Sequence, residues 1–493
     1  MGVSNRAKRL GVWSLAILTV LLVAGRMLWV SIQPPRLTAA AKSDQLISNV
    51  TIWNPGEAPL LNQTVVISDG IITDIRSTRD SDPDPMCAHC YVMPGLIDAH
   101  IHTPPRLAVG NQELFALLFL SHGVTSVRDM GQFDDSLPGF QQRLSGGDLI
   151  GPRLYRCGRI LDGHPVSVPG AVAVSDAEDA RVAVQRQASD GASCIKVYGN
   201  LSRDAFYGVA AEAERLGLPL TGHTPRALSL VNITDFEIQH YTGIPYLEQP
   251  APAGWAYRSR DLIDMSPKET ADVLATMRDN SLSFLPTNAN ARSRLTVSDP
   301  ARFPPSPGLS DVPAFWETAW PSIVSHPETD AEIETEIEAM PVALRFIREA
   351  HAAEIDVLVG SDVIMPYVIP GESIHQQLAL LTQALGSAEL ALAAATATNG
   401  QHIDEGRIGR VKVGAFADLL IFEDDPRGDI AKVQDWAHVM VDGRLYGRDE
   451  INAAVKRYRD HFRSGVYPAV MNTAYGFLAS DYEDSEVASG AGE

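Results

Sequence analysis

Short apolar runs that end in polar residues recur through the middle of the chain. They are rich in Val, Ile and Leu, as in "VMPGLIDAHIH", "CIKVYG" and "VLVGSD". Helical-looking stretches such as residues 204–216 separate them. Buried parallel strands have this composition, and their alternation with helices predicts an α/β fold.

Two flanking segments follow a different pattern, in which apolar and polar residues alternate. Residues 49–76 alternate around a turn at Asp69-Gly70, and residues 411–446 do so around a turn at Asp442-Gly443. Alternation with a period of two around an Asp-Gly turn predicts hairpin strands.

The first forty residues differ from both patterns. Arg6, Lys8 and Arg9 precede an apolar run, residues 10–32, that is broken by Arg26. The run is close to the ~20 residues that span a bilayer. Basic residues on its N-terminal side predict a signal anchor and linker over residues 1–40, with the rest of the chain in the periplasm or outside the cell. Cleavage after the anchor would make the protein secreted.

Size and charge narrow the classes of partner. The chain has 493 residues, enough for one barrel of about 250–350 residues and a smaller module. Its net charge of −21 argues against nucleic acid and against an anionic membrane surface as partners. Homo-oligomerisation stays open.

Candidate metal ligands lie where the apolar runs end. His100 and His102 are two residues apart on one predicted strand, so both imidazoles point to the same side and can meet one metal ion. Later strands end in or carry further residues of the same chemistry, which are Lys196, His223, His240 and Asp362. Four histidines and an aspartate suit Zn²⁺ or another first-row divalent ion.

These motifs, in this order, resemble the amidohydrolase superfamily, and within it the imidazolonepropionase-like and prolidase-like branch. The resemblance implies a TIM-like (β/α)8 barrel over residues 93–402 that carries the metal-dependent hydrolase site. It also implies a small β-sandwich built from both chain ends, residues 41–92 and 403–447. A C-terminal helix and acidic tail, residues 448–493, are expected to complete the chain.

The lysine indicates how many metal ions the site holds. In the two-metal branch of the superfamily, the lysine of the fourth barrel strand carries a carboxyl group derived from CO₂. Carried over, a carbamate on Lys196 would bridge two ions, one bound by His100, His102 and Asp362 and the other by His223 and His240. The alternative is a one-metal site in which Lys196 remains an ammonium.

The resemblance also implies a mechanism. A metal-bridging hydroxide would attack the substrate carbonyl, while Asp362 accepts its proton and passes it to the leaving group. His164, in "LDGHP", matches a substrate-binding position of the family. Tyr198 faces the same side of its strand as Lys196 and could donate to the developing oxyanion. Arg128 is expected to form a structural ion pair.

The expected reaction is hydrolysis of an amide, in a dipeptide or an N-acyl amino acid, so that the substrate is a small molecule with a carbonyl and a carboxylate. A lactone, an ester or a cyclic amide is the alternative. A non-catalytic extracytoplasmic binding protein is the rival from another class. The long interval between His240 and Asp362 is expected to shape the pocket, with Trp255, Trp316 and Trp320 as apolar walls.

Four cysteines complete the candidate chemistry. In an exported chain, Cys87 and Cys90 are expected to form a local disulfide. Cys157 and Cys194 lie in the predicted third and fourth barrel strands and are expected to be buried thiols, with a bond between them as the alternative.

Overall fold

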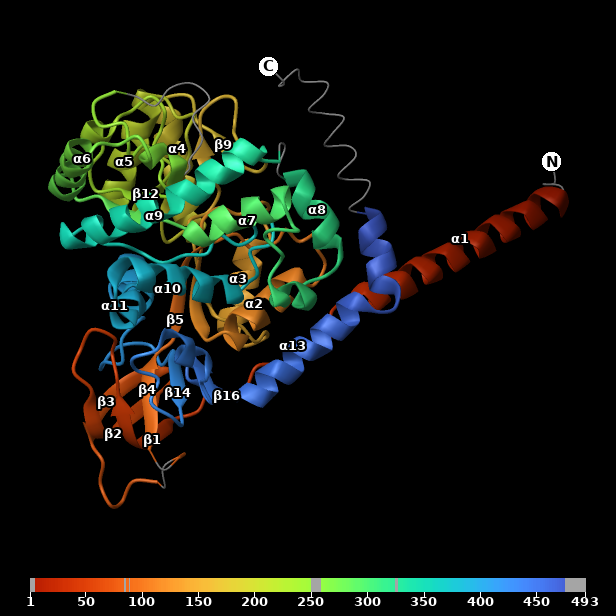
Figure 1. Cartoon of the computed structure of the whole chain (residues 1–493). Helices are drawn as coiled ribbons and strands as arrows, with labels where there is room; N and C mark the ends of the chain where they lie inside the picture. The colour runs from red at the N-terminus through yellow and green to blue at the C-terminus, as the bar shows by residue number, and fades with distance from the viewer. Residues whose placement is uncertain (1–4, 84–85, 88, 250–258, 324–326, 475–493) are drawn as a thin grey trace.

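Parallel strands surrounded by helices form the body of the protein (Figure 1), and their two sheets close into a barrel. The computed structural model describes the whole chain except residues 1–4, 84–85, 88, 250–258, 324–326 and 475–493. The regular barrel strands are β5 (Leu96–Ile101), β6 (Val124–Asp129), β7 (Arg153–Arg156), β10 (Ile195–Val197), β11 (Leu220–Gly222), β12 (Glu237–Gln239) and β13 (Ser283–Leu285). The predicted α/β fold is therefore confirmed.

Two sets of contacts close the ring. β5, β6 and β7 pair in parallel, as do β10 to β13, and the amide of Ser193 donates to the carbonyl of Arg156 at 2.8 Å between the two sets. Residues 357–363 take the eighth place, because Val357 bridges β13 and Val363 bridges β5. Two short strands, β8 (Leu161–Asp162) and β9 (Val172–Ala173), extend the sheet beside β10.

Helices surround the barrel, and their ends follow local sequence signals. In α5 (Arg203–Leu216), the Ser202 hydroxyl accepts from the amide of Ala205, and Gly217 ends the helix with a φ of 68°. The other helices after the barrel strands are α2 (Asn111–Ser121), α3 (Leu137–Gly146), α4 (Ala177–Ser189), α6 (Pro267–Asp279), α7 (Asn288–Ser298), α8 (Phe315–Ile323), α9 (Asp330–Ala352), α10 (Glu372–Leu385), α11 (Ala388–Ala393) and α12 (Asn399–Asp404).

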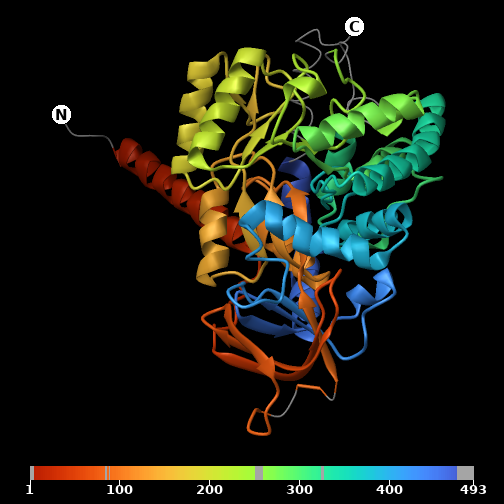
Figure 2. The same ribbon diagram turned by 90° about the vertical axis from the view of Figure 1, so that its left-hand side faces the viewer.

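The two ends of the chain share one sheet, which we call the terminal sheet and which lies beneath the barrel (Figure 2). Its strands, in spatial order, are β16 (Arg444–Gly447), β15 (His438–Val441), β14 (Leu419–Phe422), β4 (Cys90–Pro94), β1 (Gln45–Ile52), β2 (Leu60–Ser68) and β3 (Ile71–Ser77). The antiparallel pair β4–β14 joins the N-terminal strands to the C-terminal ones. Alternate residues such as Ile47, Val65 and Met440 form a core of their own.

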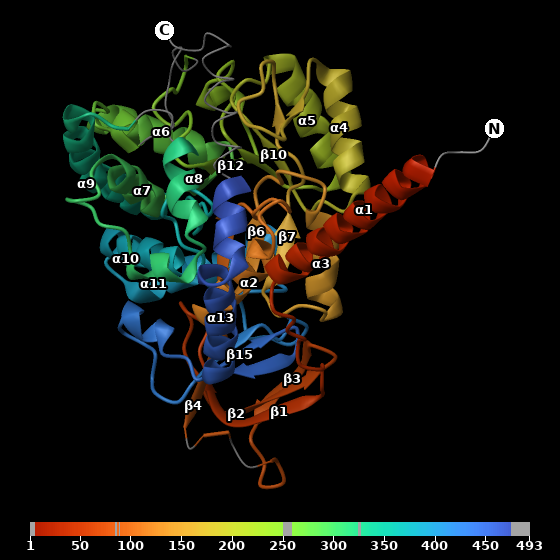
Figure 3. The same ribbon diagram turned by 90° about the vertical axis from the view of Figure 1, so that its right-hand side faces the viewer.

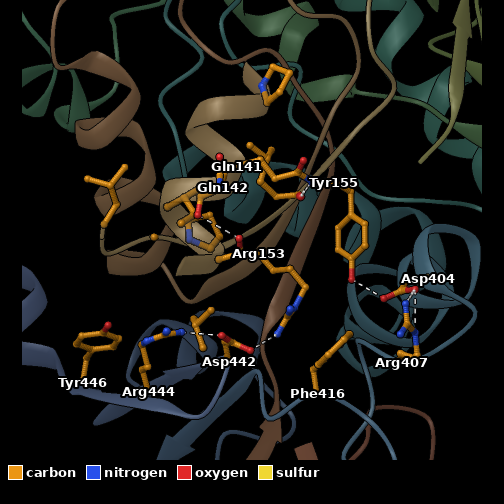
Figure 4. A pocket seen from close by; sticks show the side chains of 18 residues that line it. Gln141, Gln142, Arg153, Tyr155, Asp404, Arg407, Phe416, Asp442, Arg444 and Tyr446 are labelled. Carbon is orange, nitrogen blue, oxygen red and sulfur yellow. Dashed lines mark hydrogen bonds and ion pairs between the residues drawn. The ribbon is translucent and has the colours of Figure 1, made fainter. Parts of the chain in front are cut away.

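A hollow of about 470 Å³ separates the terminal sheet from the barrel (Figure 4). Arg153 of β7 reaches across it to Asp418 at 2.8 Å and to Asp442 at 3.3 Å. Arg444 pairs with Asp442, while Tyr155 and Arg407 both bond to Asp404. The charged side chains labelled there are all in ion pairs. We therefore interpret the hollow as part of the interface between the terminal sheet and the barrel, which these ion pairs stabilise.

The N-terminal helix α1 (Asn5–Ile32) projects away from the body (Figure 1). Its C-terminal end lies beside α13 (Arg448–Arg463), where His461 is 3.5 Å from the carbonyl of Ile32. α13 in turn lies along α2 (Figure 3). Within the described part of the chain, no helix combines the length and the apolar character needed to cross a bilayer. The predicted acidic tail from residue 475 onward lies outside the described residues.

Two disulfides are present. Cys87 bonds to Cys90, as predicted. Cys157 and Cys194 are also bonded, so the expectation of two buried thiols is wrong. The reason is barrel geometry: the residues after β7 and before β10 are neighbours across the sheet, and the two Cα atoms are 4.4 Å apart.

The disulfide between Cys157 and Cys194 should stabilise the barrel. Removing both cysteines with Cys157→Ala and Cys194→Ala should lower the free energy of unfolding by about 3–4 kcal/mol, because the bond closes a loop of 37 residues. Denaturant unfolding under non-reducing conditions measures this. The matched control, Cys87→Ala with Cys90→Ala, opens a loop of only 3 residues and should cost far less. Equal losses for the two pairs would contradict the prediction.

Candidate metal centre

The side chains predicted as metal ligands meet at the carboxyl-terminal mouth of the barrel. His100 and His102 come from the end of β5, His223 follows β11 and His240 follows β12. The ring centroids of His100 lie 5.3 Å from His102 and 5.1 Å from His240, and His223 lies 5.0 Å from His240. Four imidazoles from three strand ends therefore face one space.

Asp362 lies between the two halves of this cluster. Its Oδ1 is 3.2 Å from Nε2 of His100 and 3.7 Å from Nε2 of His102. Its Oδ2 is 3.9 Å from Nε2 of His240 and accepts a hydrogen bond of 2.6 Å from Nδ2 of Asn290. His100, His240 and Asp362 offer ligand atoms within 4.8 Å of one another, which is close enough for a shared metal ion.

Hydrogen bonds at the Nδ1 atoms orient three of the imidazoles. Nδ1 of His100 contacts Oε1 of Gln239 at 2.5 Å, and Nδ1 of His102 contacts the carbonyl of Gly131 at 3.1 Å. Nδ1 of His240 contacts the Thr287 hydroxyl at 2.5 Å. Each contact leaves Nε2 pointing into the cluster, as in metal sites where an outer partner fixes the ring.

A buried polar network lies below the histidines. Arg128 forms a two-pronged ion pair with Glu237, and one of its bonds measures 3.0 Å. The amide of Gln239 donates to Glu237 and, at 2.8 Å, to the Thr221 hydroxyl. Gln239 is therefore held with its oxygen toward His100. The structural ion pair expected for Arg128 is present.

Lys196 is a fully buried amine inside β10, and its Nζ has no hydrogen-bond partner among the described residues. Burial lowers the pKa of this ammonium, an effect that the charge of Asp362 opposes. Burial also lowers the pKa of the four imidazoles, and the charge of Lys196 adds to it. Both effects favour the neutral imidazole, the form that binds metals.

Backbone strain is concentrated around the cluster. His240, Thr287 and Asp362 adopt φ values of 57°, 36° and 65°, in the left-handed region that residues other than glycine rarely occupy. Such conformations cost of order 1–3 kcal/mol each and persist where the surrounding structure imposes them, often at functional sites. Three of them surround the same cavity.

The cluster opens into a cavity of about 350 Å³. Tyr198 lines it, with its ring stacked on His223 at a centroid distance of 3.9 Å. His164 is exposed and is absent from the described lining of the cavity, so the structure does not bring it to the cluster. The expected role of His164 in substrate binding therefore stays a prediction without a supporting contact.

Two of the three tryptophans predicted as pocket walls lie in the hydrophobic core. Trp316 and Trp320 of α8 are buried, and their indole nitrogens donate to Asn111 at 2.9 Å and to the carbonyl of Ile364 at 3.2 Å. They pack in the core and do not line the described cavity, because one face of α8 is apolar and covers α2. Trp255 lies outside the described residues.

Several cavity residues are not among the sequence predictions. Asn290 and Arg294 come from α7, Thr287 precedes that helix, and Ser259 follows the undescribed segment. The polar run "TNANARSR", residues 287–294, is the sequence signal for Thr287, Asn290 and Arg294, since residues after a barrel strand face the mouth.

Comparisons with known proteins agree with this geometry. The model of the Amidohydrolase family matches residues 91–446. Adenine deaminase of Listeria monocytogenes is 31% identical over 87 residues, a match that spans 18% of this chain and only 15% of the deaminase.

Solved structures share the fold over most of the chain. A bottromycin amidohydrolase superposes with a TM-score of 0.65 at 23% identity, covering 90% of this chain and 94% of that one. A Xaa-Pro dipeptidase with methionine bound in its active site gives a TM-score of 0.59 at 18% identity, covering 82% of this chain and 100% of the dipeptidase.

Proposed function

The chain belongs to the amidohydrolase family, and on this premise we propose that it is a metal-dependent hydrolase that cleaves the carbon–nitrogen bond of an amide. The bond would lie in a dipeptide or an N-acyl amino acid. The observation that carries the proposal is the convergence of four imidazoles, a carboxylate and a buried amine at the mouth of the barrel. The likeness to the dipeptidase fold supports the choice of bond.

The residues present fit two divalent ions, with Zn²⁺ as the proposed metal. His100, His102 and Asp362 would hold one ion, and His223 and His240 the other. An unmodified Lys196 ammonium would repel both, and its Nζ has no hydrogen-bond acceptor among the described residues. We therefore propose that Lys196 is carboxylated, so that its two new oxygens complete the site.

Carboxylation needs only carbon dioxide and the free amine. The Nζ lone pair attacks the carbon of CO₂, an N–C bond forms, and one C=O electron pair moves onto oxygen while the nitrogen releases a proton. Burial favours the neutral amine of Lys196 by lowering its pKa. The positive charge of Arg128 nearby would stabilise the carbamate anion that results.

Bound zinc would supply an activated water molecule and an electrophile for the substrate carbonyl. The residues of this chain would do the rest. Asp362 faces the centre of the cluster, with Asn290 fixing one of its oxygens, so it can accept a proton and return it to the departing nitrogen. Tyr198, at the cavity wall, offers a hydroxyl to the oxyanion.

Metal analysis together with a hydrolysis screen tests the proposal. The full-length protein, prepared with zinc and bicarbonate, is analysed for metal by mass spectrometry and assayed on dipeptide and N-acyl amino acid libraries. We expect two ions per chain, and turnover that a chelator abolishes and zinc restores. A fully loaded protein that cleaves lactones or esters but no amide would favour the alternative substrates, and one that cleaves nothing would favour a binding protein.

We also propose that the folded domain lies outside the cytoplasm. Basic residues precede the N-terminal apolar run, and the two disulfides are typical of an oxidising compartment. Protease added to cells with a permeabilised outer layer should digest the domain. A thiol-blocking mass shift should show all four cysteines already oxidised in cells. Complete protection from protease, with reduced cysteines, would contradict this localisation.

A further inference from the structure

One wall of the cavity is formed by α7, which presents Asn290 and Arg294 at a spacing of four residues. Side chains at this spacing lie on one face of a helix, about 6 Å apart along its axis. Asn290 holds Asp362 at 2.6 Å and so marks the end where bond cleavage is proposed to occur. Arg294 lies one turn farther along the same wall.

Arg294 has hydrogen-bonding capacity to spare. Its Nη2 lies 3.4 Å from Glu336 and its Nε lies 3.8 Å from Glu328, both longer than the about 2.7–2.9 Å of a charge-assisted hydrogen bond. Its buried Nε makes no hydrogen bond among the described residues. A guanidinium carries five N–H donors, so several remain for a ligand.

The two glutamates act as supports that are already engaged elsewhere. Glu336 is buried and accepts a hydrogen bond of 2.6 Å from Ser259, and Glu328 lies 3.2 Å from Arg260. Their contacts fix the direction of the Arg294 side chain but leave some of its N–H donors without an acceptor. The result is a positioned cation at the wall of the cavity.

Among the described residues that line the cavity, Arg294 is the one permanent cation. Apart from Arg294, Asp362 and the imidazoles, the polar side chains of the described lining are neutral, among them Ser259, Asn288 and Asn290. A planar guanidinium with free donors matches a carboxylate in two-pronged geometry. In a dipeptide or an N-acyl amino acid, the free carboxylate is separated from the scissile carbonyl by only the amide nitrogen and one carbon.

We infer that Arg294 binds the free carboxylate of the substrate, which restricts the substrate class to amides of amino acids with an unblocked C-terminal carboxylate. This inference rests on the proposed function. It places carboxylate binding on Arg294, while the substrate-binding role expected for His164 stays a prediction, since His164 is exposed and is not among the described residues that line the cavity. Arg294 is thus a residue that determines specificity, separate from the proposed metal ligands.

Paired substrates that differ only in the carboxylate test the inference. The kinetics of N-acyl amino acids and of their C-terminal carboxamides are compared in the zinc-loaded full-length protein. In Arg294→Met, we expect kcat/KM for the carboxylates to fall about 10- to 100-fold, mainly through KM, because a hydrogen-bonded charge is lost. The carboxamides should change by less than about threefold, and Arg294→Lys should restore part of the preference.

The matched control is Arg260→Met. This change removes a cation that pairs with Glu328, one of the two glutamates beside Arg294, and Arg260 is not among the described residues that line the cavity. It should leave the carboxylate preference unchanged. Equal losses on both substrates in Arg294→Met, or an unchanged preference, would overturn the inference. Zinc content and thermal unfolding show whether each variant is folded.

A binding measurement separates failure of this inference from failure of the proposed function. N-acetylglycine and N-acetylglycinamide serve as probes in calorimetry with the wild type and with Arg294→Met. If the wild type hydrolyses no amide, the proposed function fails, yet stronger binding of the carboxylate that is lost in Arg294→Met would still support the assignment of Arg294. Equal binding of the two probes by the wild type would overturn it.

Discussion

Asp362→Asn should retain appreciable bound metal and lose turnover by about 10²- to 10⁴-fold. The new amide keeps one oxygen as a ligand, but it is neutral and too weak a base to accept the proton from water. The local geometry should survive, because the buried Oδ1 of Asn290 lacks a hydrogen-bond partner and can accept from the new amide. Steady-state kinetics and metal analysis of the same preparation measure the two effects.

The same chemical change elsewhere provides the control. Asp418 is a buried carboxylate that pairs with Arg153 at the opposite end of the barrel strands. Asp418→Asn should lower stability, since it leaves the arginine without its main partner, while kcat changes little. A loss of turnover below about tenfold in Asp362→Asn would show that another group moves the proton.

Lys196→Ala should lose most of the bound metal and nearly all activity. If Lys196 carries the carboxyl group that joins the two ions, its removal takes away a ligand from each of them and leaves a cavity in their place. Short-chain carboxylic acids added with bicarbonate should restore part of both properties by occupying that cavity. Metal analysis and activity assays of Lys196→Ala, with and without the added acids, measure the loss and its rescue. Intact mass tests the carboxyl group itself, because the wild type should lose the mass of one carbon dioxide on acidification.

The control for Lys196→Ala is Lys268→Ala, which removes an exposed lysine that pairs with Asp272 on α6. It should leave metal content and rate unchanged. Full metal content and full rate in Lys196→Ala would refute the bridging role and favour the one-metal alternative.

Much of the barrel could be predicted because each of its strands is encoded by a short, continuous stretch of sequence. Each strand is a short apolar run, and the polar residue that ends it must face the mouth, as with His223 and His240. The residues that orient the predicted ligands could not be predicted. Gln239 contacts His100, Thr287 contacts His240 and Asn290 donates to Asp362, and these pairs form only when segments distant in sequence are placed side by side. The bond between Cys157 and Cys194 escaped prediction for the same reason.

The insertion after the seventh strand, β13, shows where sequence reasoning fails. Its tryptophans suggest substrate walls, because large aromatic side chains are common in pockets. Yet Trp316 and Trp320 are 3% and 0% exposed and pack against each other in the core. Composition identifies a side chain that must be buried, but only the path of the chain decides whether a ligand or another helix buries it.

The terminal sheet cannot be completed until late in the synthesis of the chain. β4 is paired on both edges only once β14 is present, and β14 is synthesised roughly 330 residues later, on the order of tens of seconds at ordinary rates of synthesis. During that interval β4 presents an open apolar edge, the kind of surface on which nascent chains associate. Chaperones that shield such edges should therefore govern the yield of this protein, and chains that terminate before residue 419 should aggregate.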